Sequence, residues 1–149
     1  MFSAKQVIEA VEKFATDYNV PVEDIVISAG GSMVYHGYRF VTRDIDASVP
    51  EDTFNSLVKT TGLPVVELDP LGSFPGVRMI SFPELKIDIQ CGGIPASEDL
   101  VQLKTLPQRP ACWFLTPDAL YRQKVAMGRK KDLDDIVRMQ LGGYKIGEM

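Results

Sequence analysis

Long hydrophobic runs are absent from this sequence, and no apolar stretch approaches the roughly 20 residues that cross a bilayer. The first residues also lack the charged and then apolar layout of a signal peptide. Basic residues are not in excess, because 16 lysines and arginines face 20 acidic residues, for a net charge of −4. We therefore expect a cytoplasmic protein with no membrane partner and no strong binding to long DNA, which would need a positive field.

Cysteine and histidine are also scarce. Cys91 and Cys112 lack the close spacing of a metal-binding pair, and in a reducing compartment they are expected to be small core residues. The single histidine, His36, is expected to pack and hydrogen-bond rather than act as a base. Without repeats, low-complexity tracts or long linkers, the 149 residues predict one domain, with a core at about 1–115 and C-terminal helices at about 116–141.

The hydrophobic periodicity predicts an α/β (α+β) chain. Helix patterns, with their caps, occur at about 3–18, 33–38, 51–61, 118–127 and 131–140. Strand patterns occur at about 25–27, 44–49, 65–68, 77–82, 85–90 and 112–115. We expect 77–82 and 85–90 to form a hairpin, 91–110 to be loop-like and 112–115 to lie at a sheet edge. The predicted fold is a small, mixed, twisted sheet with helices packed on one face and a helical C-terminal segment beside a cleft.

Two aspartates straddle one isoleucine in the predicted strand 44–49. Because side chains alternate across a strand, Asp44 and Asp46 lie on one face, about 7 Å apart along the backbone. The same alternation places Asp88 on the polar face of the strand 85–90, where it can face the first two. The alternative is that all three are solvated aspartates on amphipathic strands.

Three carboxylates on one sheet face repel one another and raise each other's pKa unless a cation lies among them. Mg²⁺ prefers hard oxygen ligands, keeps several waters and shares its other positions with substrate phosphates. Two such ions about 4 Å apart would activate an attacking oxygen and stabilise a leaving pyrophosphate. We therefore predict that Asp44, Asp46 and Asp88 are catalytic metal ligands for two Mg²⁺ or Mn²⁺ ions.

A glycine-rich turn precedes the aspartates. Gly30 and Gly31 would let the backbone approach a ligand closely, and amide groups at the start of the following helix attract anions. We expect this turn to hold the triphosphate of an NTP, with the Ser32 hydroxyl donating to a phosphate oxygen. Most such turns only connect elements, so the specificity of the motif comes from the strand with Asp-x-Asp that follows.

This Gly-Gly-Ser turn, short helix and Asp-x-Asp strand resemble the signature of the DNA polymerase β-like nucleotidyltransferase superfamily. With His36-Gly37, Arg39 and Thr42-Arg43, the pattern is similar to small prokaryotic and phage nucleotidyltransferase-like proteins that include the AbiEii-type toxins. The segments 117–124 and 128–136 also resemble the C-terminal helices of that group, so that the resemblance spans about 25–141. Met33, in place of a small residue, and Ala47-Ser48, in place of a more apolar continuation, depart from the pattern.

The resemblance implies a role for each matching residue. Asp44 and Asp46 would hold the metals, Asp88 would complete the site beside the attacking hydroxyl, and Gly31 and Ser32 would hold the β- and γ-phosphates.

Basic residues near these motifs have two interpretations each. Lys124 either points toward the triphosphate, as the resemblance implies, or is a surface lysine. Arg39 and Arg43 either neutralise phosphate charge or are solvated or salt-bridged. The basic run 129–131, followed by acidic residues, is expected to be a self-paired, solvated helix start.

The leading interpretation is metal-dependent transfer of an NMP from an NTP to a hydroxyl, with release of pyrophosphate. The acceptor would be a small molecule, a protein or the end of a structured RNA. One alternative is a catalytically silent nucleotide-binding or antitoxin-like module of the same fold. The retained carboxylates argue against it, because a retired site has no physical reason to keep like charges together. Another alternative is a phosphoesterase that uses the same metals.

Overall fold

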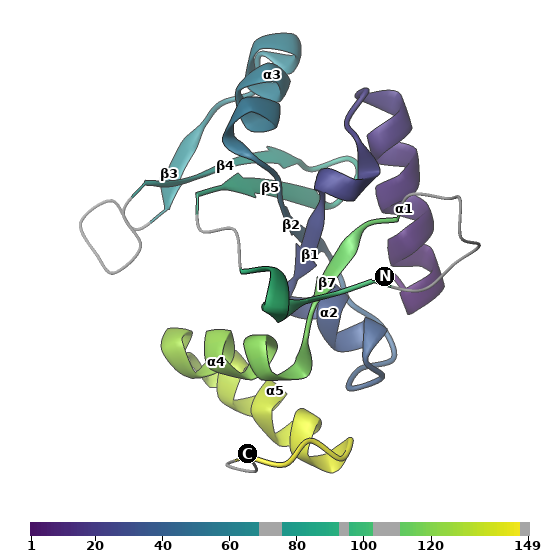
Figure 1. The fold of residues 1–149 in the computed structure, drawn as a ribbon, viewed down its shortest axis with the longest axis vertical. Coiled ribbons are helices and arrows are strands. Elements are labelled where there is room, and N and C mark those ends of the chain that lie inside the picture. The colour runs from purple at the N-terminus through teal and green to yellow at the C-terminus, as the bar shows by residue number, and fades with distance from the viewer. Residues whose placement is uncertain (69–75, 93–95, 103–110, 147–149) are drawn as a thin grey trace.

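The computed structural model describes residues 1–68, 76–92, 96–102 and 111–146. Figure 1 shows a mixed α/β arrangement that confirms the expected fold class, with a seven-stranded sheet in the order β3-β4-β5-β2-β1-β7-β6. The strands are β1 (Val26–Ser28), β2 (Ile45–Ser48), β3 (Val66–Leu68), β4 (Val77–Phe82), β5 (Ile87–Cys91), β6 (Leu100–Val101) and β7 (Trp113–Leu115). The α-helices are α1 (Ala4–Asp17), α2 (Ala29–Tyr35), α3 (Glu51–Thr61), α4 (Pro117–Met127) and α5 (Lys130–Leu141).

Strand pairing is both parallel and antiparallel. β1 pairs antiparallel with β2 and parallel with β7, and β2 pairs parallel with β5. β4 and β5 form the expected antiparallel hairpin, with β3 antiparallel to β4. The prediction that β7 is an edge strand was wrong, because the two-residue strand β6 pairs on its other side, within a stretch expected to be loop. The parts 93–95 and 103–110 of that expected loop lie outside the described residues.

The main core lies between one face of the central strands and the helices α1 and α3. Ile45, Ala47, Ile87 and Ile89 are each no more than 2% exposed on this face. They pack in one cluster with side chains of both helices, namely Val7, Val11, Phe14, Phe54 and Leu57. Because side chains alternate, this burial turns Asp46 and Asp88 to the opposite face.

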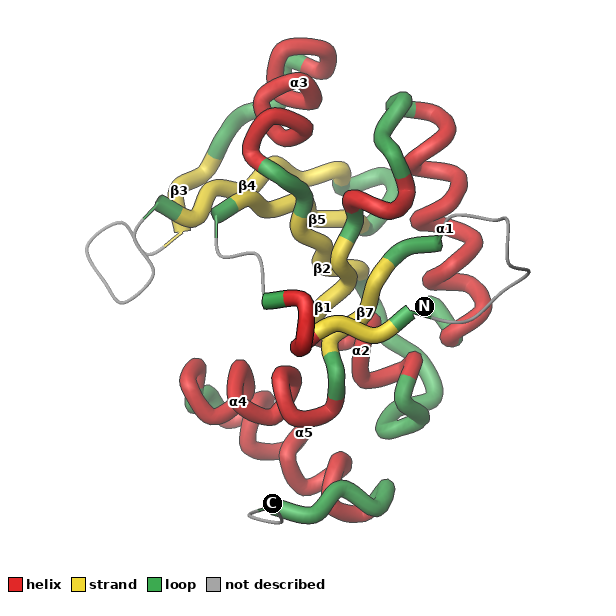
Figure 2. Tube along the Cα trace, viewed as in Figure 1, coloured by secondary structure: helices red, strands yellow, loops and turns green. Residues whose placement is uncertain are grey.

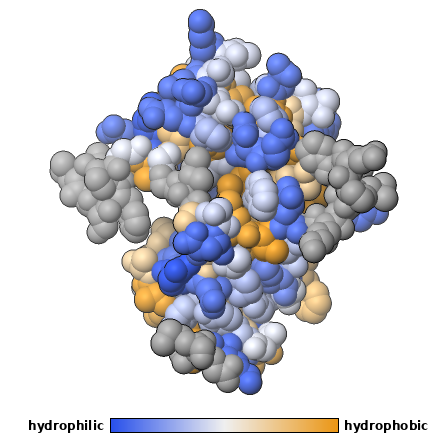
Figure 3. Space-filling view, viewed as in Figure 1, coloured by the Kyte–Doolittle hydropathy of each residue, from blue (hydrophilic) through white to orange (hydrophobic). Residues whose placement is uncertain are grey.

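A second apolar cluster attaches the C-terminal helices to the sheet. It joins β1, α2, β7, α4 and α5 through buried Val26, Met33, Leu115, Leu120 and Met139. Figure 2 places α4 and α5 at the opposite end of the molecule from α3. Figure 3 shows apolar surface over the outer ends of α4 and α5, which carry half-exposed to exposed Val125, Met127, Leu133, Val137 and Leu141.

Local signals account for most helix ends. Ser3 and Gln6 form the expected capping box at the start of α1. α3 follows Pro50 and ends at Gly62, which adopts the left-handed conformation with φ 66°. Thr116 caps α4 and Pro117 occupies its first position, as expected. No helix in the described ranges is long and apolar enough to cross a membrane.

Helix α2 differs from its prediction. It begins at Ala29 rather than Met33, so the two glycines form its first turn instead of a loop before it. The chain turns directly from strand to helix because Ala29 adopts a left-handed φ of 48°, a conformation that an L-residue rarely takes. The prediction was wrong because glycine normally disfavours a helix, whereas here close packing requires it.

Candidate active site

A row of polar residues crosses four strands at one register on the face opposite the core. Ser81 of β4 pairs with Asp88 of β5, Asp88 pairs with Asp46 of β2, and Asp46 pairs with Ser28 of β1. Each of these side chains is half-buried. The structure therefore brings Asp46 and Asp88 side by side, on strands about 4.8 Å apart. Ser28 and Ser81 were not predicted as site residues, although each lies on the polar side of its strand.

Asp44 lies just before β2, two residues before Asp46 in the sequence, and its side chain is exposed. Its backbone carbonyl accepts a hydrogen bond from the Thr42 hydroxyl at 3.1 Å. Burial and then the negative charges of Asp44 and Asp88 raise the pKa of Asp46, and Lys124 and Lys131 oppose them, so that the pKa is raised to about 6. Asp46 is therefore a carboxyl group whose ionised form lacks sufficient positive charge around it.

The donor set suits a hard divalent cation, because Asp46 and Asp88 are neighbours on one face and Asp44 adds a further negative charge that acts on Asp46. Among the residues that the structure describes, however, no three His, Cys, Asp or Glu side chains are gathered around a point where they could hold a metal ion. The residue types and their common face fit Mg²⁺ chemistry. The ligand geometry is not preformed among the described residues.

The two glycines pack too closely for any side chain. A Cβ on Gly31 would lie 2.4 Å from Ile27 Cγ2, and one on Gly30 would lie 2.2 Å from Thr42 Oγ1. Gly30 also faces Arg39, since the same Cβ would be 3.9 Å from its Nη1 atom. The glycines thus let α2 approach both β1 and the segment that leads to Asp44. The unusual φ of Ala29 beside them is the kind of backbone strain that concentrates at functional sites.

Ser32 does not lie as expected. Its hydroxyl is fully buried, donates to the Ile27 carbonyl at 2.8 Å and accepts from the Leu115 amide at 3.1 Å. It therefore presents no surface to a phosphate, and the expected hydrogen bond to a phosphate oxygen was wrong for this arrangement. The position after the glycines faces inward along α2, which lets Ser32 tie the helix to β1 and β7.

His36 has the structural role expected of it. Its Nε2 atom donates to the Leu115 carbonyl at 2.6 Å, and burial lowers the pKa of the imidazole although that hydrogen bond opposes the shift. The ring also packs against Tyr35. His36 is thus a neutral, bonded link between α2 and β7.

Lys124 is a buried residue with buried acidic partners. It is 5% exposed, and its Nζ lies 2.9 Å from Asp135 Oδ2 and 3.6 Å from Asp132 Oδ1. Arg39 also binds Asp135, through Nη2 at 2.6 Å and Nε at 3.0 Å. We call Lys124, Arg39, Asp132 and Asp135 the ion cluster; it joins α4, α5 and the segment after α2. The alternative of a surface lysine was wrong, because Lys124 is buried, and its charge lowers the pKa of Asp46. Its orientation toward a triphosphate stays a prediction.

The two acids of the ion cluster were expected to be solvated, and that prediction was wrong. Asp132 is fully buried and Asp135 is 2% exposed. Burial raises the pKa of each carboxyl, but the hydrogen bonds from Arg129 to Asp132, and from Lys124 and Arg39 to Asp135, outweigh it and lower both pKa values. Their place on α5 explains this burial, since positions 132, 135 and 139 lie on the inner side of the helix.

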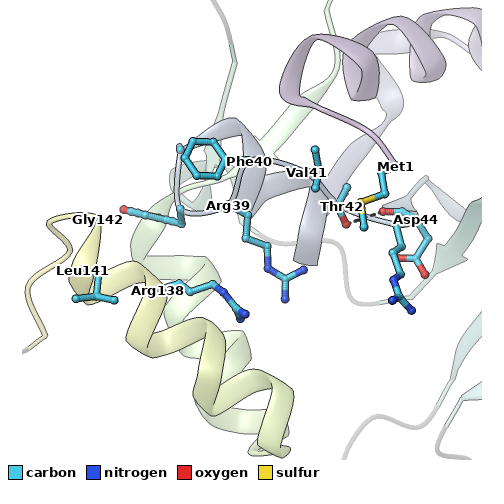
Figure 4. A pocket seen from close by; sticks show the side chains of 12 residues that line it. Met1, Arg39, Phe40, Val41, Thr42, Asp44, Arg138, Leu141 and Gly142 are labelled. Atoms are coloured by element: carbon cyan, nitrogen blue, oxygen red, sulfur yellow. Dashed lines mark hydrogen bonds between the residues drawn. The ribbon is translucent and has the colours of Figure 1, made fainter.

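The two arginines before β2 differ. Arg39 takes the salt-bridged alternative through Asp135, whereas Arg43 is exposed and forms no ion pair with the described residues. Both border a hollow of about 760 Å³ that Asp44 also lines. Figure 4 shows Arg39 and Arg138 pointing toward one another at one side of this hollow and Asp44 at the other.

The fold that carries these residues is similar to that of two solved nucleotidyltransferase structures. The chain is similar to ANT(2'')-Ia, whose crystal structure holds adenylyl-2''-tobramycin, with a TM-score of 0.53 and 15% identity over 91% of this chain and 87% of that one. It is also similar to a nucleotidyltransferase-like protein of Thermotoga maritima, with a TM-score of 0.56 and 12% identity over 96% and 97% of the two chains.

These likenesses establish a nucleotidyltransferase fold. No protein-family model matches the sequence, and no curated protein matches it. The resemblance to AbiEii-type toxins therefore stays a prediction.

Proposed function

We propose that this protein is a metal-dependent nucleotidyltransferase that moves an NMP from an NTP to a hydroxyl group. One observation carries the proposal: Asp46 and Asp88 are register partners on the two central parallel strands, and Asp46 is held there with its pKa raised to about 6. Like charges held close together cost stability. A divalent cation would offset the charge of the carboxylates and would also bind the triphosphate. The nucleotidyltransferase fold of the chain supports the same conclusion.

The carboxylates of Asp44, Asp46 and Asp88 would hold Mg²⁺ or Mn²⁺ ions. When bound, these ions supply positive charge that offsets the carboxylates and the phosphates and stabilises the charge that develops during transfer. Asp88, the outermost of the three along the sheet, would accept the proton of the acceptor hydroxyl. The acceptor oxygen then bonds to the α-phosphorus as the bond to pyrophosphate breaks.

The remaining residues would position the nucleotide. The backbone amides of Gly30 and Gly31 open α2 beside the carboxylates and would meet the phosphates at close range. Arg43 is exposed and unpaired among described residues, so it is available for phosphate charge. Lys124 would act from within the ion cluster by partly offsetting the charge of Asp46 rather than by touching phosphate. Ser32 would hold the glycine turn in place through its two buried hydrogen bonds.

The acceptor is a small molecule, a protein or the end of an RNA. ANT(2'')-Ia holds an adenylylated small molecule, which supports the first of these. A catalytically silent nucleotide-binding or antitoxin-like module of the same fold is the alternative. It differs from the enzyme in one measurable respect, because it would bind a partner or a nucleotide without transferring a phosphate group.

The decisive experiment incubates the protein with each α-labelled NTP, Mg²⁺ or Mn²⁺, and cell extract. We expect label on an acceptor, and we expect Asp46→Asn and Asp88→Asn to abolish it. Asp52→Asn is the matched control, since Asp52 is an exposed aspartate on α3 and its loss should leave transfer intact. Stable complexes without label would favour the silent module, and release of phosphate without an NTP would favour a phosphoesterase.

A further inference from the structure

The hollow beside Asp44 has the size and position of a second substrate site. It has a volume of about 760 Å³ and lies between the segment 37–44 and the C-terminal end of α5 (Figure 4). Pockets of about 300–1,000 Å³ commonly take small ligands. Because Asp44 forms part of its wall, the hollow lies beside the candidate carboxylates.

The wall of the hollow is positively charged. Arg39, Arg43 and Arg138 line it, against one carboxylate, that of Asp44. Arg39 and Arg138 lie 2.6 and 3.0 Å from the same oxygen of Asp135, which also pairs with Lys124, so one carboxylate serves three cations. A chain of net charge −4 therefore concentrates positive charge here. Guanidinium groups bind phosphate in a bidentate manner, so the wall suits a phosphorylated ligand.

The same wall carries exposed apolar side chains. Phe40 is 96% exposed, Leu141 84% and Met1 72%. An exposed phenyl ring offers a face on which a nucleobase can stack. A polyamine would meet three guanidinium groups, and an uncharged apolar compound would leave them unused. A phosphate joined to a flat ring, as in a nucleotide, satisfies both parts of the wall.

Resting on the proposed function, we propose that this hollow receives the acceptor and that the acceptor is a nucleotide unit. Its phosphate faces Arg39 and Arg138, which converge at one side of the hollow (Figure 4), its base stacks on Phe40, and its hydroxyl points past Asp44 toward Asp46 and Asp88. The acceptor oxygen forms the new bond to the α-phosphorus, its proton passes to a carboxylate, and pyrophosphate leaves. This chemistry is shared by a free mononucleotide and by the terminal nucleotide of a single strand.

The test measures binding of 5′-AMP and of a five-nucleotide adenosine RNA to the full chain by calorimetry, without NTP or metal. We expect Phe40→Ala and Arg138→Gln each to raise the dissociation constant about tenfold or more. Lys59→Gln is the matched control, since it removes one exposed positive charge on α3 and should leave binding unchanged. Binding should persist when a non-hydrolysable Mg–ATP analogue is present at saturation.

The outcomes separate the sources and the proposals. If AMP and the RNA bind with equal affinity, the acceptor is a free nucleotide. If the RNA binds more tightly, the acceptor is the end of a strand. Either result supports the inference. It is overturned if neither binds, if spermidine binds more tightly, if both variants bind like the wild type, or if the ATP analogue displaces the ligand. If nucleotide binding depends on Phe40 but no label is transferred, the proposed function is refuted and the nucleotide site is not. If label is transferred to a compound without phosphate, the inference that the acceptor is a nucleotide is refuted and the proposed function is not.

Discussion

Two groups of buried or half-buried carboxylates in this protein have opposite electrostatics. On the polar face of the sheet, Asp46 is crowded by Asp44 and Asp88, and its pKa is raised to about 6. In the ion cluster, Asp132 and Asp135 are more deeply buried, yet their pKa values are lowered. Burial penalises the charged form in both places, and among the described residues only the second place supplies cations within hydrogen-bond distance.

The difference separates a structural role from a functional one. In the ion cluster the fold itself supplies the counter-charges, through Lys124, Arg39 and Arg129, so the charges hold α4 and α5 in place. At the row of aspartates the counter-charge is incomplete. A titratable group whose charge the protein does not balance is a candidate for binding or catalysis, because a bound ligand can supply the missing counter-charge.

The largest expected effect comes from removing the charge of Asp46. Asp46→Asn should lower nucleotidyl transfer by at least about 10²–10³-fold, the range seen when one electrostatic stabiliser of a transition state is lost. The same change should raise the melting temperature of the metal-free protein at pH 8, because a poorly compensated charge disappears. Transfer assays and thermal melts on one preparation test both effects. Loss of activity together with loss of stability would mean that Asp46 has a structural role. The difference between Asp46 and the acids of the ion cluster would then disappear.

The next effect is on stability and concerns the ion cluster. Lys124→Met removes the cation between two buried acids and should destabilise the fold by about 3–5 kcal/mol, the usual cost of leaving a buried charge unpaired. Lys130→Met, at an exposed position one helix away, should change stability by no more than about 0.5 kcal/mol. Urea unfolding of both variants measures the difference. Equal, small effects would show that Lys124 is dispensable to the fold.

A smaller effect is expected at α2, which lies between the two regions. Gly31→Ala should destabilise by about 1–3 kcal/mol, because the added methyl meets Ile27 in a packed core. Ala29→Gly should be neutral or stabilising, since it relieves a left-handed φ of 48° that costs an L-residue about 1–2 kcal/mol. Opposite signs in chemical denaturation would confirm the account, and a neutral Gly31→Ala would show that α2 shifts to make room.

The smallest effect is a pH dependence of the metal-free protein. A folded-state pKa of about 6 for Asp46, above the usual 3.8, contributes stability that is present at low pH and lost as pH rises through 6. The lowered pKa values of Asp132 and Asp135 contribute stability that is lost as pH falls below the ordinary pKa of an aspartate. They therefore do not change stability between pH 5 and pH 7. The melting temperature should therefore fall between pH 5 and pH 7 in the wild type relative to Asp46→Asn. Saturating Mg²⁺ should remove this difference, and parallel curves without metal would contradict the raised pKa.

Local chemistry predicted much of the fold. The bounds of α3 follow from Pro50 and Gly62, and those of β4 from the apolar run that ends before Pro83. β6 was missed because two residues are too short to show a period. The glycines were placed before α2 instead of within it, because what they contact, Ile27 and Thr42, is a matter of packing.

The candidate site was predicted unevenly for a similar reason. Alternation along β2 and β5 was enough to place Asp46 and Asp88 on the polar face, and strand pairing then made them neighbours. The buried hydroxyl of Ser32 and the ion cluster around Lys124 were not predicted, since both depend on partners far along the chain. Ser32 binds Leu115, and Arg39 binds Asp135.

By itself, the sequence determined the helices and strands, their inward faces and the side of the sheet that carries aspartates, because periodicity, caps and glycine conformations act over a few residues. Only the tertiary structure decided which charges have partners. Lys124 and Asp135 meet because α4 and α5 pack together, whereas Asp44, Asp46 and Asp88 share a face that no cation fully compensates. The physical reason is that electrostatic energy depends on distance and burial in three dimensions, and neither is encoded in the spacing of residues along the chain.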